Sequence, residues 1–173
     1  LDAWVAPAPD LSREEALAKL ALNYFRSHAP ATLKDFIWWS GLTISEAKRA
    51  VGALGNGLCR ECIGGQEFLF HQSCRESGKG DCFHFLPSYD EYLIAYKDRS
   101  AALDAVHVPK VHNKWGIFYP VLLYQGKIVG NWTKKQGKER ISFTVSFFEQ
   151  ENGVEPRLVE SAGKEFLRFC GRY

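Results

Sequence analysis

The sequence contains no methionine and begins with Leu1. We therefore expect that it does not include a translation start and that it is the C-terminal part of a longer protein with a further N-terminal domain. It also has no charged start followed by an apolar segment, which argues against a secretory signal. Its longest apolar stretch, residues 115–124, is about half a membrane span and contains Pro120, so we expect no membrane partner.

The sequence contains few cysteines, and their number, five, is odd. In a chain without a secretory start, this usage predicts reduced thiols and a cytoplasmic location. Cys59 and Cys62 have zinc-ligand spacing, and other possible ligands follow at His71, Cys74, Cys82 and His84. However, a two-residue gap in an extended strand directs the two sulfurs to opposite faces, so we expect no metal site.

Signatures of catalysis are also missing. The sequence has no phosphate-binding glycine loop and no Ser-His-Asp or Cys-His pattern, and it predicts no cofactor. Asp90 and Glu91 lie among aromatic residues, which is compatible with a general base. Because they are adjacent in sequence, the two carboxylates need not point to one site. We therefore favour a role in capping the helix that follows.

What the sequence has is a substantial core and little net charge. Hydrophobic residues make up 46% and aromatic residues 14%, whereas the net charge is only +2. Contact with phosphates would therefore depend on local clusters of basic residues rather than on overall charge.

The N-terminal half predicts three helices. Residues 1–11 form an irregular arm, and Ser12 and Glu15 have capping-box spacing at the start of a helix that ends near Ser27. Thr32 can cap a second helix over residues 33–40, which Gly41 ends.

The third helix opens with a second capping box, Thr43 and Glu46. Its apolar periodicity predicts four inward residues: Ile44, Ala47, Val51 and Leu54. The opposite face then displays Ser45, Lys48, Arg49 and Gly52.

A hairpin follows the third helix. Strand-like residues 58–62 and 66–70 flank Gly64-Gly65, a dipeptide suited to a two-residue turn. Three helices with a short turn between the last two, followed by a hairpin, predict a winged helix over residues 12–80.

Residues 81–173 predict a second, α+β domain. Phe83 to Leu86 has strand character, and residues 116–124, 127–134 and 140–148 predict a three-stranded meander. From Pro156 onward, apolar residues at helical spacing predict a C-terminal helix on the sheet. The predicted fold class is α+β.

Double-stranded DNA is the favoured partner. Ser45, Lys48 and Arg49 on the third helix could approach a major groove, and Lys34 and Arg60 could add phosphate contacts. A second basic cluster lies near Trp132 and comprises Lys127, Lys134, Lys135, Lys138 and Arg140. It could follow a nucleic-acid backbone or simply form an exposed turn. In the first case Trp132 could stack on a base.

Three segments resemble a bacterial family of winged-helix proteins that includes DNA glycosylases acting on bulky alkylated bases and interstrand crosslinks. They are Thr32-Leu-Lys-Asp-Phe-Ile-Trp-Trp-Ser-Gly-Leu-Thr43, Leu86-Pro-Ser-Tyr-Asp-Glu-Tyr-Leu93 with Tyr96-Lys-Asp-Arg99, and Gly126-Lys-Ile-Val-Gly-Asn-Trp132. The resemblance covers most of the chain and implies the C-terminal part of such a protein.

The resemblance also implies where chemistry would lie. Glycosylases of this family use two glutamines, or a glutamine and an aspartate, separated by one apolar residue in their N-terminal part. This sequence contains no such triplet, so no catalytic residue is assigned. The leading hypothesis is a DNA-binding module, and its rivals are part of a DNA glycosylase and a winged-helix protein-interaction module.

Overall fold

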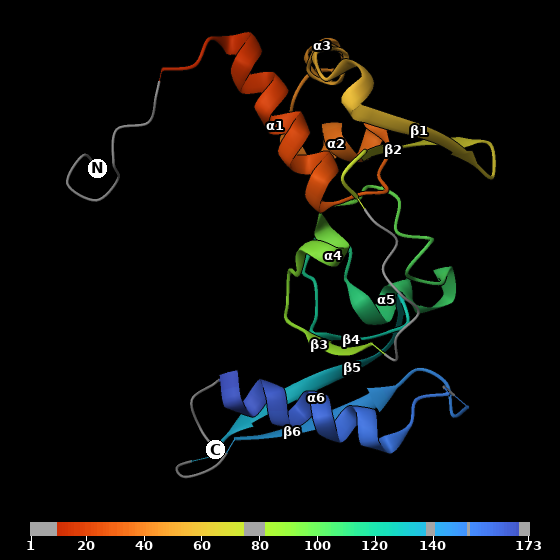
Figure 1. Cartoon of the computed structure of the whole chain (residues 1–173). Coiled ribbons are helices and arrows are strands. Elements are labelled where there is room, and N and C mark those ends of the chain that lie inside the picture. Colours follow the sequence, from red (N-terminus) through yellow and green to blue (C-terminus); the bar gives the residue numbers. More distant parts are fainter. Residues whose placement is uncertain (1–9, 75–81, 138–140, 152, 170–173) are drawn as a thin grey trace. The chain divides into compact units, whose positions relative to one another are not determined.

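A computed structural model describes residues 10–74, 82–137, 141–151 and 153–169 (Figure 1). The chain divides into two compact units, which are described separately. Unit 1 comprises residues 1–76 together with residues 95–97, and unit 2 comprises residues 77–94 and 98–173. No helix in the described part is long and apolar enough to cross a membrane.

Unit 1 contains three helices and a hairpin. The elements are α1 (Arg13–Ser27), α2 (Leu33–Ser40), α3 (Ile44–Ala53), the 3₁₀ turn η1 (Gly55–Gly57), β1 (Leu58–Ile63) and β2 (Gln66–His71). Each α-helix begins with a complete capping box, in which a Ser or Thr hydroxyl and a carboxylate three residues later satisfy each other's backbone N–H groups. The helix starts therefore follow from local sequence.

The hairpin of unit 1 is antiparallel, with Ile63 opposite Gln66. Both turn residues have positive φ, 58° at Gly64 and 79° at Gly65, a conformation that glycine adopts without strain. A bridge between Ala31 and Leu69 ties β2 to the segment before α2. The aromatic core of Tyr24, Phe25 and Phe36 is completely buried.

The inward face of α3 differs from the prediction at its start. Ala47 and Val51 are buried and Leu54 is partly buried, as expected, but Ile44 is 62% exposed. Ile44 is the first residue of α3 and precedes the residues of the helix that are buried. Those residues include Ala50, which the prediction did not name. The predicted burial of Ile44 is wrong.

Unit 2 is built on an antiparallel sheet with the strand order β3-β4-β5-β6. Its strands are β3 (Phe83–Leu86), β4 (Val121–Tyr124), β5 (Lys127–Gln136) and β6 (Ile141–Phe147). Its helices are α4 (Glu91–Ile94), the 3₁₀ turn η2 (Ala105–His107), α5 (Val108–Val111) and α6 (Pro156–Phe169). The predicted α+β class and the C-terminal helix are confirmed.

The predicted strand over residues 116–124 is shorter than expected, because β4 begins at Val121. Gly116 has a φ of 75° and Pro120 lacks an N–H for the ladder, so the preceding residues form a turn instead. Pro120 still contributes its carbonyl, which accepts a hydrogen bond from the Asn131 side chain at 3.0 Å.

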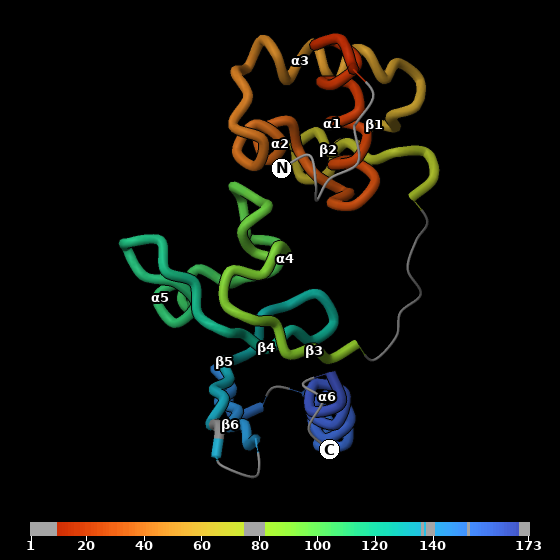
Figure 2. Tube along the Cα trace, turned by 90° about the vertical axis from the view of Figure 1, so that its left-hand side faces the viewer, coloured from red at the N-terminus to blue at the C-terminus, as the bar shows by residue number. Residues whose placement is uncertain are grey.

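Helix α6 lies along β5 and β6 (Figures 1 and 2). Trp132 is central to this packing: its ring centroid is 5.0 Å from that of Phe166 and 5.4 Å from that of Phe85. Its indole N–H donates to the carbonyl of Leu86 at 2.8 Å, and the residue is only 6% exposed. Trp132 is thus a core residue, and the hypothesis that it stacks on a base is wrong.

Candidate nucleic-acid interface

The outer face of α3 exposes Ser45, Lys48 and Arg49, the residues expected to approach a groove. Arg49 forms an ion pair with Glu14 of α1, with 3.4 Å between Nη2 and Oε1, and both side chains are more than half exposed. Exposed pairs of this kind contribute about 0–1 kcal/mol, so the Arg49 guanidinium can exchange Glu14 for a phosphate at little cost.

The carboxylate of Glu46 lies on the same helix but is occupied by its cap. It accepts hydrogen bonds from the Thr43 hydroxyl at 2.7 Å and the Thr43 backbone N–H at 3.1 Å, and it pairs with Arg13. These contacts lower the pKa of Glu46 to about 2, and the hydrogen bond from the Thr43 hydroxyl contributes most. The α3 surface therefore carries acidic as well as basic groups, and its positive charge is modest.

Lys34 lies at the rim of a hollow of about 320 Å³ on unit 1. The hollow is lined by Lys34, Ile37, Trp38, Gly41, Leu42 and Lys97. Lys34, Lys97 and the Trp38 indole are exposed. Two lysines beside an indole suit a ligand that carries a phosphate next to a ring, such as a nucleotide.

Lys97 is brought to this hollow by a segment distant in sequence. Its backbone N–H donates to Oδ1 of Asp35 at 2.9 Å, and the buried Asp35 also caps α2 through Thr32. The Tyr24 hydroxyl donates to the carbonyl of Ala95 at 3.2 Å, and the Tyr96 hydroxyl donates to that of His28 at 2.9 Å. The sequence analysis missed Lys97 because no local pattern predicts that this segment packs against α2.

The hairpin of unit 1 exposes Arg60, as expected for a wing contact. Its guanidinium is held by Glu67 of the neighbouring strand, 2.8 Å from Nη1 to Oε1. Like Arg49, Arg60 would exchange this exposed carboxylate for a phosphate on binding DNA.

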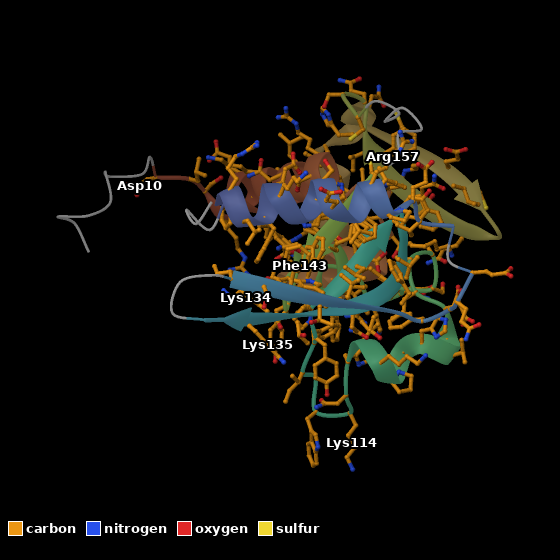
Figure 3. All side chains as sticks on the ribbon, turned by 90° about the horizontal axis from the view of Figure 1, so that it is seen from below. Asp10, Lys114, Lys134, Lys135, Phe143 and Arg157 are labelled. Atoms are coloured by element: carbon orange, nitrogen blue, oxygen red, sulfur yellow. The ribbon has the colours of Figure 1, made fainter. Side chains whose placement is uncertain are left out.

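Lys134 and Lys135 belong to unit 2, near the end of the β5–β6 hairpin (Figure 3). They lie opposite Phe143 and Ser142 and are both exposed. Adjacent residues of a strand point to opposite faces, so the two ammonium groups extend from both sides of the hairpin. Lys127 of the same predicted cluster lies 3.7 Å from a carboxylate oxygen of Asp104. Lys138 and Arg140 lie outside the described residues.

The remaining candidate groups have local roles. Oδ1 of Asp90 accepts from the N–H of Tyr92 at 2.9 Å, and the Asp90 carbonyl accepts from the N–H groups of Leu93 and Ile94, so Asp90 caps α4 as favoured. Cys59 and Cys62 lie three residues apart in β1 and so on opposite faces of the strand. Within the described ranges no group of three His, Cys, Asp or Glu could hold a metal ion.

A protein-family model matches almost the whole chain. The model described as "DNA glycosylase AlkZ-like" matches residues 1–169. The chain belongs to the AlkZ-like DNA glycosylase family. The resemblance inferred from the three sequence segments is thus confirmed.

A solved structure shares the fold of this AlkZ-like chain. It is a DNA glycosylase AlkZ from Streptomyces sahachiroi, with a TM-score of 0.79, 19% sequence identity and 95% of this chain covered. The chain spans 46% of the length of that protein. A comparison with curated proteins gave no match.

Proposed function

We propose that this chain is the DNA-binding part of a DNA glycosylase, and that α1, α2, α3 and the β1–β2 hairpin act as a winged helix on duplex DNA. Membership of the AlkZ-like DNA glycosylase family over residues 1–169 is the observation that carries this proposal. The three helices and the hairpin in chain order are consistent with it.

In this proposal α3 approaches the major groove with Ser45, Lys48 and Arg49. Arg60 on the hairpin and Lys34 on α2 bind phosphates of the same duplex. Because Glu14 pairs with Arg49, Glu67 pairs with Arg60 and Glu46 lies on α3 itself, we expect modest affinity that falls steeply with salt.

The whole protein would hydrolyse the N-glycosidic bond of an alkylated or crosslinked base. We assign no catalytic residue to this chain, since its sequence contains no pair of glutamines, or glutamine and aspartate, separated by one apolar residue. The role proposed for this chain is to hold the duplex in a fixed position relative to catalytic groups elsewhere in the protein.

Titration of a labelled duplex with the wild-type chain and with K48A/R49A tests the groove contact. The double substitution should weaken binding by about 1–3 kcal/mol at low salt, because two cations close to DNA are lost. Folding should be unchanged, since both side chains are exposed.

The control is K19A/R26A, which removes the same charge from exposed positions of α1. If both double variants lost the same affinity for DNA, α3 would not be the element that contacts the duplex. If the wild-type chain binds no duplex even at low salt, the proposed function is wrong and a protein-interaction module becomes the better description.

A further inference from the structure

Residues 112–119 of unit 2 form a tightly hydrogen-bonded turn between α5 and β4, which we name the Trp115 turn. Oδ1 of Asn113 accepts from the N–H groups of Trp115 at 2.9 Å and Ile117 at 3.1 Å. The backbone of Asn113 also bonds with that of Ile117 and Gly116, both at 3.1 Å. Gly116 supplies the positive φ of 75° that closes the turn.

The base of the Trp115 turn is fixed to the body of unit 2. His112 and Phe118 form a β-bridge, and the N–H of Tyr119 donates to the carbonyl of the completely buried Val111 at 2.9 Å. The Phe118 ring contacts Tyr89 and lies 5.1 Å from the Arg99 guanidinium carbon. The turn is therefore held in one conformation at both its base and its tip.

The tip nevertheless presents a large apolar side chain to solvent. Trp115 is 78% exposed, and Ile117 and Tyr119 beside it are also exposed. Lys114 accompanies it, with Nζ 5.1 Å from the centroid of the indole, and extends from a turn that projects away from the sheet (Figure 3). Several exposed apolar side chains on one hydrogen-bonded turn are typical of an interaction site.

Charge indicates the chemistry of the partner. Residues 105–138 contain six lysines and no aspartate or glutamate, in a chain that has 20 acidic residues. In the described part of the chain, Asp104 pairs with Lys127 and Glu149 with His107 of this stretch, and both contacts lie outside the Trp115 turn. An exposed indole within a basic stretch suits a nucleic acid, whose bases stack and whose phosphates attract cations.

We propose that the Trp115 turn binds DNA at a break in base stacking, with the Trp115 indole stacked on a nucleobase and Lys114 against the adjacent phosphate. An indole can stack only where a base face is open, and a continuous B-form duplex has none except at its ends. Unpaired, gapped or kinked steps provide such a face. This inference rests on the proposed function, because it requires that the chain binds DNA.

The experiment compares two labelled duplexes of the same length, one fully paired and one with a single unpaired adenine. Stacking is worth about 1–3 kcal/mol per base, so W115A should bind the interrupted duplex about 5- to 150-fold more weakly than the wild type. Its binding to the paired duplex should change by less than about two-fold, and W115F should retain most of the affinity because it keeps an aromatic face.

Two further variants separate stacking from charge and from general surface effects. K114A should weaken binding to the interrupted duplex more than to the paired one and lower the salt slope for the interrupted duplex by about 0.9, as expected for one phosphate contact. F169A removes a highly exposed aromatic ring at the end of α6 and should bind both duplexes like the wild type.

The outcomes distinguish this inference from the proposed function. If the wild type binds both duplexes and W115A binds the interrupted one equally well, the Trp115 turn is not a stacking site although the chain binds DNA. If F169A loses as much as W115A, the preference is not specific to the turn and the inference fails. If the wild type binds neither duplex at low salt, both proposals are wrong.

Discussion

At the scale of single residues, two glycines show how strongly the surroundings determine the effect of one methyl group. Gly130 in β5 lies where a Cβ would be 3.0 Å from the Cα of Phe147 and 3.1 Å from Cδ1 of Leu122. Gly52 in α3 has open space at the same position. The same substitution should therefore have opposite effects at the two sites.

We expect G130A to destabilise unit 2 by about 1–3 kcal/mol, because β6 backbone atoms cannot move away from the new methyl group without disturbing the sheet. G52A should stabilise α3 by about 0.5–1 kcal/mol, since alanine is the better helix former. Urea unfolding followed by tryptophan fluorescence measures both. Equal midpoints for the two variants would contradict the packing described around Gly130.

At the scale of elements, the first turn of α3 depends on an ionised carboxylate. Hydrogen bonds from the Thr43 hydroxyl and backbone N–H, together with Arg13, lower the pKa of Glu46 from its ordinary range to about 2. A group whose pKa falls on folding stabilises the folded state above its unfolded pKa and loses this contribution as pH falls through its folded pKa. The cap is therefore complete above about pH 5 and weakens toward pH 2.

The matching prediction is that E46Q makes the stability of the fold less dependent on pH under acidic conditions. Between pH 5 and pH 2 the urea midpoint of the wild type should fall more steeply than that of E46Q, whose amide carries no titrating proton. E61Q, at an exposed position of β1, is the control and should keep the wild-type slope. Parallel curves for wild type and E46Q would show that this cap does not contribute.

At the scale of the whole molecule, basic residues occur in both units, and the salt dependence of DNA binding reports how many of them meet phosphates. Replacing Lys134 and Lys135 by alanine should lower the salt slope by up to about 1.8, because each phosphate contact contributes about 0.9. K164A is the control, since its ammonium group pairs with Glu160 at 2.6 Å on α6. An unchanged slope in K134A/K135A would indicate that the hairpin lysines only keep an exposed strand end soluble.

Local sequence predicted much of the fold at this scale. The capping boxes at Ser12 and Thr43, the helix end at Gly41 and the Gly64-Gly65 turn depend on hydrogen bonds and dihedral angles within a few residues. The α+β class and the membership of the glycosylase family follow equally from patterns and motifs in the sequence. These features need no knowledge of distant contacts.

Tertiary structure decided which side chains face solvent and which meet. Trp115 and Trp132 both lie in aromatic, basic stretches, yet the first is exposed on a turn and the second is buried under α6. Lys97 joins Lys34 because Asp35 and Tyr24 bind the segment that carries it. Burial and convergence depend on contacts between residues far apart in the chain, and a periodic pattern cannot specify those contacts.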